Sequence, residues 1–117
     1  MAELTAQPEA KLPSAALLRI EAEKLRPEFV TLAQQWRRDT VHFSRVSQKV
    51  AHPAYRRIMA MGESAIPLLL ESLRDRPAHW FAALTAAARL DPVPARSNAA
   101  TARERWLEWG RKEGLVD

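Results

Sequence analysis

Two histidines stand directly beside aromatic motifs and are the first residues of this chain whose types could do chemistry. His52 opens the run His-Pro-Ala-Tyr and His79 opens His-Trp-Phe, so each could act as a general base, a metal ligand or a helix cap. No histidine is paired with a carboxylate at the i, i+3 or i, i+4 spacing of a metal site within a confidently predicted helix, and His42 stands in an uncertain connector, although the fold could still unite such groups in space. The pattern therefore favours capping or packing for both residues and predicts no metal site.

Other arrangements that carry catalysis or bind cofactors are missing from the sequence. The chain has no cysteine, its serines are scattered without a nucleophile elbow, and its three glycines form neither a phosphate loop nor a dinucleotide fingerprint. We therefore expect no catalytic residues and no cofactor, and we predict that the protein is not an enzyme.

A basic segment is the strongest indication of a binding surface. Positions 37 to 57 carry six Lys or Arg residues and the single acid Asp39, whereas the rest of the chain carries twelve basic and thirteen acidic residues. This concentration, with a pI near 10.1, suits nucleic-acid phosphates, an acidic protein partner or merely a solvated face. The six candidate binding residues are Arg37, Arg38, Arg45, Lys49, Arg56 and Arg57.

Four tryptophans form a second group of candidates. Trp36 and Trp80 fall on apolar stripes and are expected in the core, with the indole N–H bonded at its rim. Trp106 and Trp109 lie near the end of the chain, where a short helix could leave one ring exposed. We therefore add these two residues to the candidate binding set.

These residues must be positioned by a single small domain. The chain has 117 residues, of which 47% are apolar and 27% charged, as in average globular proteins. We expect residues 14–117 to form one α-helical domain, preceded by a mobile segment over residues 1–13. No apolar run is long enough to span a membrane, no signal peptide is evident and cysteine is absent, so we predict a cytoplasmic protein.

The apolar spacing predicts an all-α fold of five or six short helices. Ser14 is a candidate N-cap for the first helix. Pro27 is expected either to break this helix or to open a second helix at its first turn. That second helix carries Trp36 on its apolar stripe. Residues 40–51 have a mixed period and are expected to form a short helix or an irregular connector.

Caps and turn residues divide the second half of the chain. His52 and Pro53 indicate a helix start, Gly62 a left-handed C-terminal cap, and Ser64 a cap for the next helix. Asn98 is expected to cap the last helix. The buried stripes between these points are predicted to include Ile66, Leu69, Leu70, Leu73, Trp80, Phe81, Leu84 and Ala88.

Residues 52–91 resemble a helical hairpin of the HEAT-repeat type, with Gly62 and Ala-Ile-Pro-Leu-Leu before a Leu-rich helix and an Ala-rich helix after it. The ordered motifs HPAY, MG, PLLL, HWF, DPVP and WLEWG also resemble a family of small bacterial proteins. That family tends to carry an Ile-Thr-Gly-Glu type of segment before Asp-Pro-Val-Pro, where this chain has Ala-Ala-Arg-Leu. The resemblance implies the helical fold and no particular activity.

The residues together favour a non-enzymatic interaction module that presents a basic helical face to a protein partner, as an accessory, adaptor or antitoxin-like subunit. The alternative is a nucleic-acid-binding accessory protein that uses the same basic residues.

Overall fold

The fold was obtained as a computed structural model that describes residues 12–76 and 78–117. The predicted all-α class is confirmed: the described residues form six α-helices and one 3-10 helix, without a strand. Of the segment predicted as mobile, residues 1–11 lie outside the described residues, and Leu12 packs against the core. The elements are α1 (Ala15–Thr40), α2 (Val46–Val50), α3 (Pro53–Ala60), η2 (Gly62–Ala65), α4 (Ile66–Asp75), α5 (Phe81–Ala88) and α6 (Ala99–Lys112).

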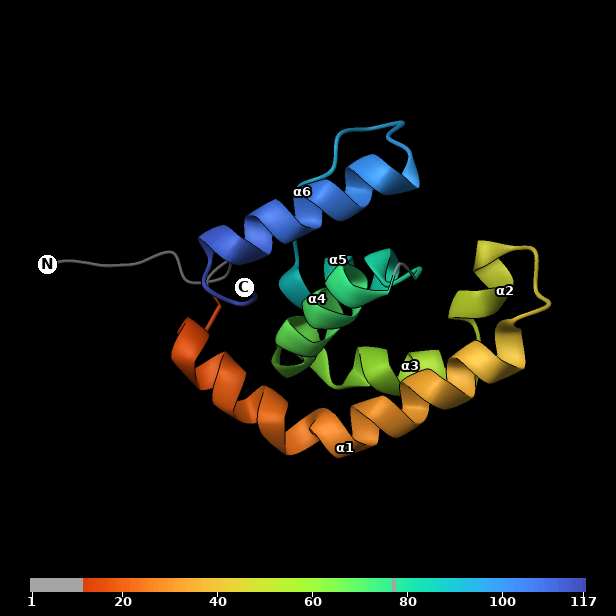
Figure 1. Ribbon diagram of the computed structural model, residues 1–117, viewed down its shortest axis with the longest axis horizontal. Helices are drawn as coiled ribbons and strands as arrows, with labels where there is room; N and C mark the ends of the chain where they lie inside the picture. Colours follow the sequence, from red (N-terminus) through yellow and green to blue (C-terminus); the bar gives the residue numbers. More distant parts are fainter. Residues whose placement is uncertain (1–11, 77) are drawn as a thin grey trace, which may run out of the picture.

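The first helix is twice as long as the sequence predicted, because Pro27 lies inside α1 and does not end it. The expected break is therefore wrong. An internal proline costs a helix about 3 kcal/mol, but α1 buries one continuous stripe on both sides of it, and each large apolar side chain contributes ~1.5–3 kcal/mol. Figure 1 shows the result, a curved α1 that wraps around one side of the molecule. The buried residues of α1 are Leu18, Ala22, Phe29, Ala33, Trp36 and Thr40.

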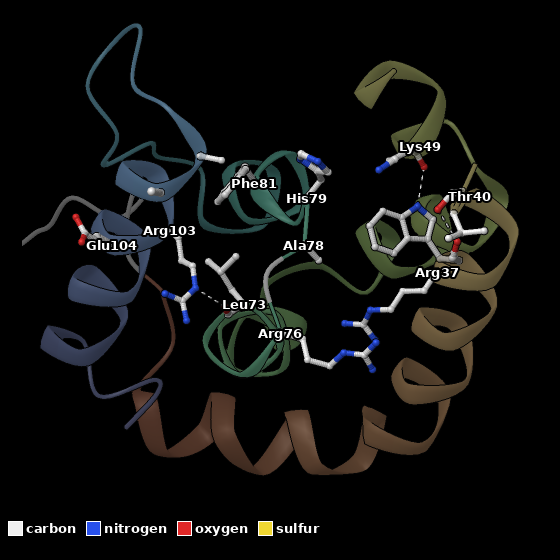
Figure 2. Close-up of a pocket in the computed structure, with 14 residues that line it drawn as sticks. Arg37, Thr40, Lys49, Leu73, Arg76, Ala78, His79, Phe81, Arg103 and Glu104 are labelled. Carbon is white, nitrogen blue, oxygen red and sulfur yellow. Dashed lines mark hydrogen bonds between the residues drawn. The ribbon is translucent and has the colours of Figure 1, made fainter. Parts of the chain in front are cut away.

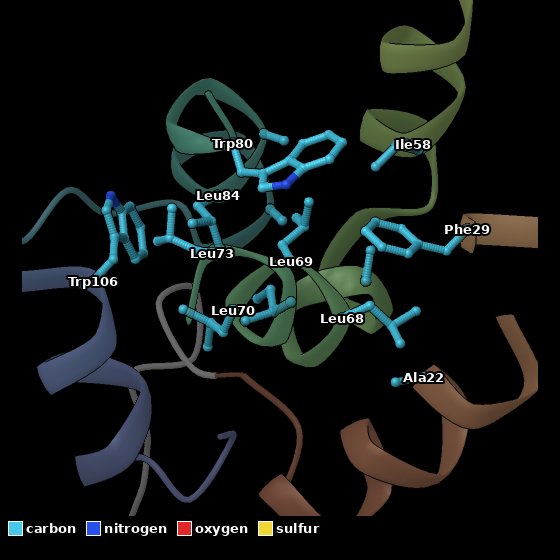
Figure 3. Close-up of a cluster of buried hydrophobic side chains, with 14 of the residues drawn as sticks. Ala22, Phe29, Ile58, Leu68, Leu69, Leu70, Leu73, Trp80, Leu84 and Trp106 are labelled. Atoms are coloured by element: carbon cyan, nitrogen blue, oxygen red, sulfur yellow. The ribbon is translucent and has the colours of Figure 1, made fainter. Parts of the chain in front are cut away.

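Helix α4 is the centre of the fold. Its Leu69, Leu70 and Leu73 are at most 1% exposed, and α1, α5 and α6 all pack against it. Arg26 of α1 donates two hydrogen bonds to the carboxylate of Glu71, at 2.8 and 3.1 Å, and so ties α1 to α4 at the edge of this packing. Figure 3 shows α4 surrounded by side chains that come from the other helices.

An aromatic cluster fills the space between α1, α3 and the start of α5. Trp80 is fully buried, and its ring centroid lies 5.7 Å from that of Phe29, 4.6 Å from that of Trp36 and 5.4 Å from that of Tyr55. Burial raises the pKa of Tyr55 to about 12. Its hydroxyl therefore stays protonated and donates to the carbonyl of His79 while accepting from the amide of Ala83.

Most of the predicted caps are confirmed. The side chains of Ser14 and Asn98 accept hydrogen bonds from amides in the first turns of α1 and α6, and Gly62 has a φ of +70°. The predicted cap at Ser64 is wrong, because Ser64 lies within η2 and its side chain does not cap α4. The chain passes directly from the 3-10 helix η2 into α4. The residues before α4 are therefore already helical, and no separate side-chain cap marks its start.

Residues 40–51 contain both structures that their mixed period predicted. The chain leaves α1 at Thr40, runs through an irregular segment over residues 41–45, and forms the short helix α2. The indole Nε1 of Trp36 donates to the carbonyl of Lys49 at 2.8 Å, which holds α2 beside the end of α1.

The last helix lies close against α4. A Cβ atom placed on Gly110 would come within 2.6 Å of Leu70 Cδ1 and 3.0 Å of Val116 Cγ1, so the absence of a side chain permits this approach. The chain then turns at Gly114, where φ is +75°, and buries Leu115 and Val116. Across the described ranges, no helix combines the length and apolar character needed to cross a membrane.

Candidate binding cleft

A cleft of about 730 Å³ lies between the end of α1 and the start of α6. Its floor is the carboxyl end of α4 and the segment that joins α4 to α5 (Figure 2). This volume is within the range of sites that bind small molecules or partner side chains. The lining residues are Trp36, Arg37, Thr40, Val41, Lys49, Leu73, Arg76, Ala78, His79, Phe81, Ala99, Ala100, Arg103 and Glu104.

Arg37 is held in place within the cleft by two neighbouring side chains. Its guanidinium donates to Ser72 Oγ at 2.7 Å, and its Cζ lies 6.0 Å from the ring centroid of Trp80. Because Ser72 Oγ also accepts from Trp80 Nε1 at 3.0 Å, the arginine is held by a hydroxyl that is itself fixed. The side chain of Arg37 is thus positioned before any ligand arrives.

This half-buried guanidinium has no carboxylate within 4.0 Å among residues 12–76 and 78–117. Burial, and to a smaller extent the nearby charge of Arg76, lower the pKa of Arg37 from its ordinary value. Both effects mean that the positive charge is less well stabilised here than in water. An anion bound beside it would relieve that cost.

Three further cations surround the cleft, from three different elements. Arg76 follows α4 directly and is exposed, and Figure 2 shows its guanidinium reaching toward that of Arg37. Lys49 contributes from α2. Arg103 of α6 donates to the carbonyls of Leu73 and Arg74, at 2.8 and 2.6 Å, and so satisfies the open carboxyl end of α4.

Apolar side chains make up half of the cleft lining. Phe81 and Ala78 are partly exposed on the floor, Val41 is 67% exposed at the rim beside α1, and Ala99 and Ala100 form the first turn of α6. The cleft is therefore a mixed surface: Val41 stands beside the cations at the end of α1, and Arg103 stands on the opposite wall with the apolar first turn of α6.

The two histidines have different surroundings. His52 caps α3, since its Nδ1 accepts from the amide of Ala54 at 3.0 Å, which leaves the proton on Nε2, 3.0 Å from Asp39 Oδ2. The capping prediction is confirmed for this residue. His79 lines the cleft, where burial and then the charge of Lys49 lower the pKa of its imidazole. It is therefore a neutral donor or acceptor at neutral pH.

The structure separates the six basic residues that the sequence grouped together. Arg37 and Lys49 line the cleft, whereas the other four do not. Arg57 pairs with Glu28 at 2.8 Å, and Arg38 lies 3.7 Å from Asp39. Arg45 and Arg56 are exposed. Two of the six predicted residues therefore line the cleft, and a basic face shared by all six stays a prediction.

Sequence reasoning missed Arg76 and Arg103. Both lie outside the segment from 37 to 57, and only the packing of α4 and α6 brings them to the cleft. The available signal was their position, since Arg76 follows the predicted end of a Leu-rich helix and Arg103 lies one turn before Trp106 in the last helix.

The two tryptophans of α6 also differ from each other. Trp106 is 0% exposed and lies in the core, because α6 turns this ring toward α4 and α5. The prediction that Trp106 is a surface binding residue is therefore wrong. Trp109 is partly exposed and meets Trp106 edge to face, with 5.4 Å between ring centroids. A binding role for Trp109 stays a prediction.

Comparison with known proteins adds no family. No protein-family model, no curated protein and no solved structure matches the chain. Within the described ranges, no group of three or more His, Asp or Glu side chains is arranged to hold a metal ion. The function must therefore be inferred from the chemistry of the cleft.

Proposed function

We propose that this protein is a non-enzymatic interaction module that binds an acidic segment of a partner protein in the cleft between α1 and α6. The observation that carries the proposal is the half-buried guanidinium of Arg37, which faces Arg76 and has no carboxylate partner within the described chain. A partner carboxylate between these two arginines would supply the missing charge.

The energetics favour such a partner. Arg37 is already held by Ser72 and stacked near Trp80, so little side-chain entropy is lost when a carboxylate binds. A guanidinium can donate two parallel hydrogen bonds to one carboxylate, and such charged bonds contribute about 1.5–3 kcal/mol each. The cleft thus offers a strong contact at a site that is positioned in advance.

An acidic protein suits this arrangement better than a nucleic acid does. Arg37, Lys49, Arg76 and Arg103 converge on a concave site with apolar walls, whereas phosphate backbones are bound by cations spread along an exposed face. The nucleic-acid alternative uses all six basic residues of positions 37 to 57, and four of them, Arg38, Arg45, Arg56 and Arg57, lie outside the cleft.

We also propose that the chain is a member of the small bacterial family described above and that residues 52–91 form a hairpin of the HEAT type. Several residues of the shared motifs have structural roles: His52 caps α3, Gly62 takes a positive φ and Trp80 fills the core, while His79 and Phe81 of the HWF motif line the cleft. None of the cleft cations lies in these motifs, so relatives could keep the scaffold and differ in their partners. Lack of cysteine supports a cytoplasmic setting.

The test is quantitative capture of partners from a nuclease-treated lysate of the source cells, with the protein as bait. We expect Arg76→Gln to weaken retention of a specific partner about tenfold, as loss of one charged contact would do, and Arg37→Gln to weaken it further. Arg56→Gln is the matched control, because it removes the same charge from an exposed site outside the cleft.

Two results would overturn the proposal. One is a partner that the parent, Arg76→Gln and the Arg37→Gln/Arg76→Gln double variant, shown to be folded by circular dichroism, all retain equally. The other is capture that is seen only in a parallel lysate without nuclease and that depends on Arg56, which would favour the nucleic-acid alternative.

A further inference from the structure

The cleft has two chemically distinct parts. The guanidinium groups of Arg37 and Arg76 approach each other near the end of α1, while Phe81 lies farther toward α6 (Figure 2), where Ala99 and Ala100 begin that helix. A ligand that is only an anion would leave the apolar surface of the cleft exposed to water. A ligand that is only apolar would leave the charge of Arg37 without a counter-charge.

We infer that the cleft recognises an acidic residue adjoining a large apolar residue of the partner segment, with the carboxylate between Arg37 and Arg76 and the apolar side chain against Phe81. This inference rests on the proposed function and makes it specific: it names the two side chains that the partner must supply. Val41, 67% exposed at the rim beside α1, is a further apolar side chain that the partner segment can cover.

The hydrogen-bond donors that are free to bind a ligand support the placement of the carboxylate between Arg37 and Arg76. Arg103 is committed to the carbonyls of Leu73 and Arg74, so it holds α4 in place and has fewer donors left for a ligand. Arg76 makes no ion pair with any described carboxylate, and Arg37 uses one donor on Ser72. The donors that remain free are therefore concentrated at the Arg37 and Arg76 end of the cleft.

A carboxylate fits this end better than a phosphate. A phosphate is more strongly hydrated and carries more charge, so placing it beside Phe81, Ala78 and Val41 would cost more desolvation. A carboxylate presents two oxygens in the plane that a guanidinium fork matches. A mononucleotide, which joins a phosphate to an aromatic ring, is the competing ligand that the experiment must separate.

Four blocked dipeptides test the two parts one at a time: acetyl-Glu-Phe-amide, acetyl-Gln-Phe-amide, acetyl-Glu-Gly-amide and acetyl-Gln-Gly-amide. Each is titrated into the full chain while the indole N–H resonance of Trp36, which lies in the cleft lining, is followed by NMR. We expect acetyl-Glu-Phe-amide to bind about tenfold more tightly than either singly changed peptide. Adenosine monophosphate and inorganic phosphate serve as the phosphate probes.

The variants use the same readout. Arg76→Gln, at an exposed position, should abolish the preference for Glu over Gln while leaving the preference for Phe over Gly, and Phe81→Ala should do the opposite. Arg56→Gln should bind all four peptides as the parent does. These split effects require direct contact, since a general loss of structure would reduce both preferences together.

Each remaining result has a definite meaning. Equal binding of all four dipeptides, or tighter binding of adenosine monophosphate than of acetyl-Glu-Phe-amide, overturns the inference. If Arg76→Gln abolishes partner capture but Phe and Gly peptides bind alike, the apolar part of the inference fails and the proposed function stands. A preference for acetyl-Glu-Phe-amide without any partner captured through Arg76 supports the subsite and contradicts the proposed function.

Discussion

Replacing Trp80 by alanine is expected to lower the free energy of unfolding by about 3–5 kcal/mol, the range for an aromatic side chain removed from a core. Trp80 is fully buried, contacts Phe29, Trp36 and Tyr55, and donates to Ser72 Oγ. Its loss would leave a cavity at the junction of α1, α3 and α5. Urea denaturation followed by circular dichroism at 222 nm measures the change.

Trp109→Ala is the matched control for this substitution. Trp109 is partly exposed and packs at the edge of the core, edge to face with Trp106, so its removal should cost clearly less than removal of Trp80. Equal losses for the two variants would show that the aromatic cluster around Trp80 is not the dominant packing centre.

Leu70→Ala is expected to cost about 2–5 kcal/mol, because Leu70 is 0% exposed on the central helix. Its Cδ1 lies 2.6 Å from the position that a Cβ on Gly110 would take, so this leucine also fills the contact between α4 and α6. We expect the melting temperature and the urea midpoint to fall together, in a single cooperative transition.

Leu17→Ala provides the comparison, since Leu17 is 47% exposed on α1 and should change stability by no more than about 0.5 kcal/mol. A Leu70→Ala variant as stable as Leu17→Ala would contradict the placement of α4 at the centre of the fold.

Local patterns were enough to predict much of this architecture. The stripe of Leu69, Leu70 and Leu73 is buried as its spacing indicated, and the caps at Ser14 and Asn98 form where a polar side chain precedes an apolar period. These features depend on neighbours within one or two helical turns, which the sequence displays directly.

The features that sequence reasoning missed depend on packing between distant elements. Pro27 is tolerated because the stripe of α1 stays buried on both sides of it, and that burial is decided by α3 and α4. The cleft cations Arg76 and Arg103 come from segments that are remote from Arg37 in sequence. A count of charges along the chain therefore found half of the cleft's four basic residues and grouped them with arginines that lie elsewhere.

The central claim is that an acidic partner segment binds in the cleft between α1 and α6, and NMR mapping tests it most directly. The full chain, labelled with ¹⁵N, is titrated with a short peptide rich in Glu and Phe and, separately, with a short DNA duplex. We expect the peptide to shift the side-chain Nε–H signals of Arg37 and Arg76 and the indole signal of Trp36, with saturation, while the duplex leaves them unchanged. Shifts confined to Arg38, Arg45 and Arg56, or produced by the duplex alone, would contradict the account.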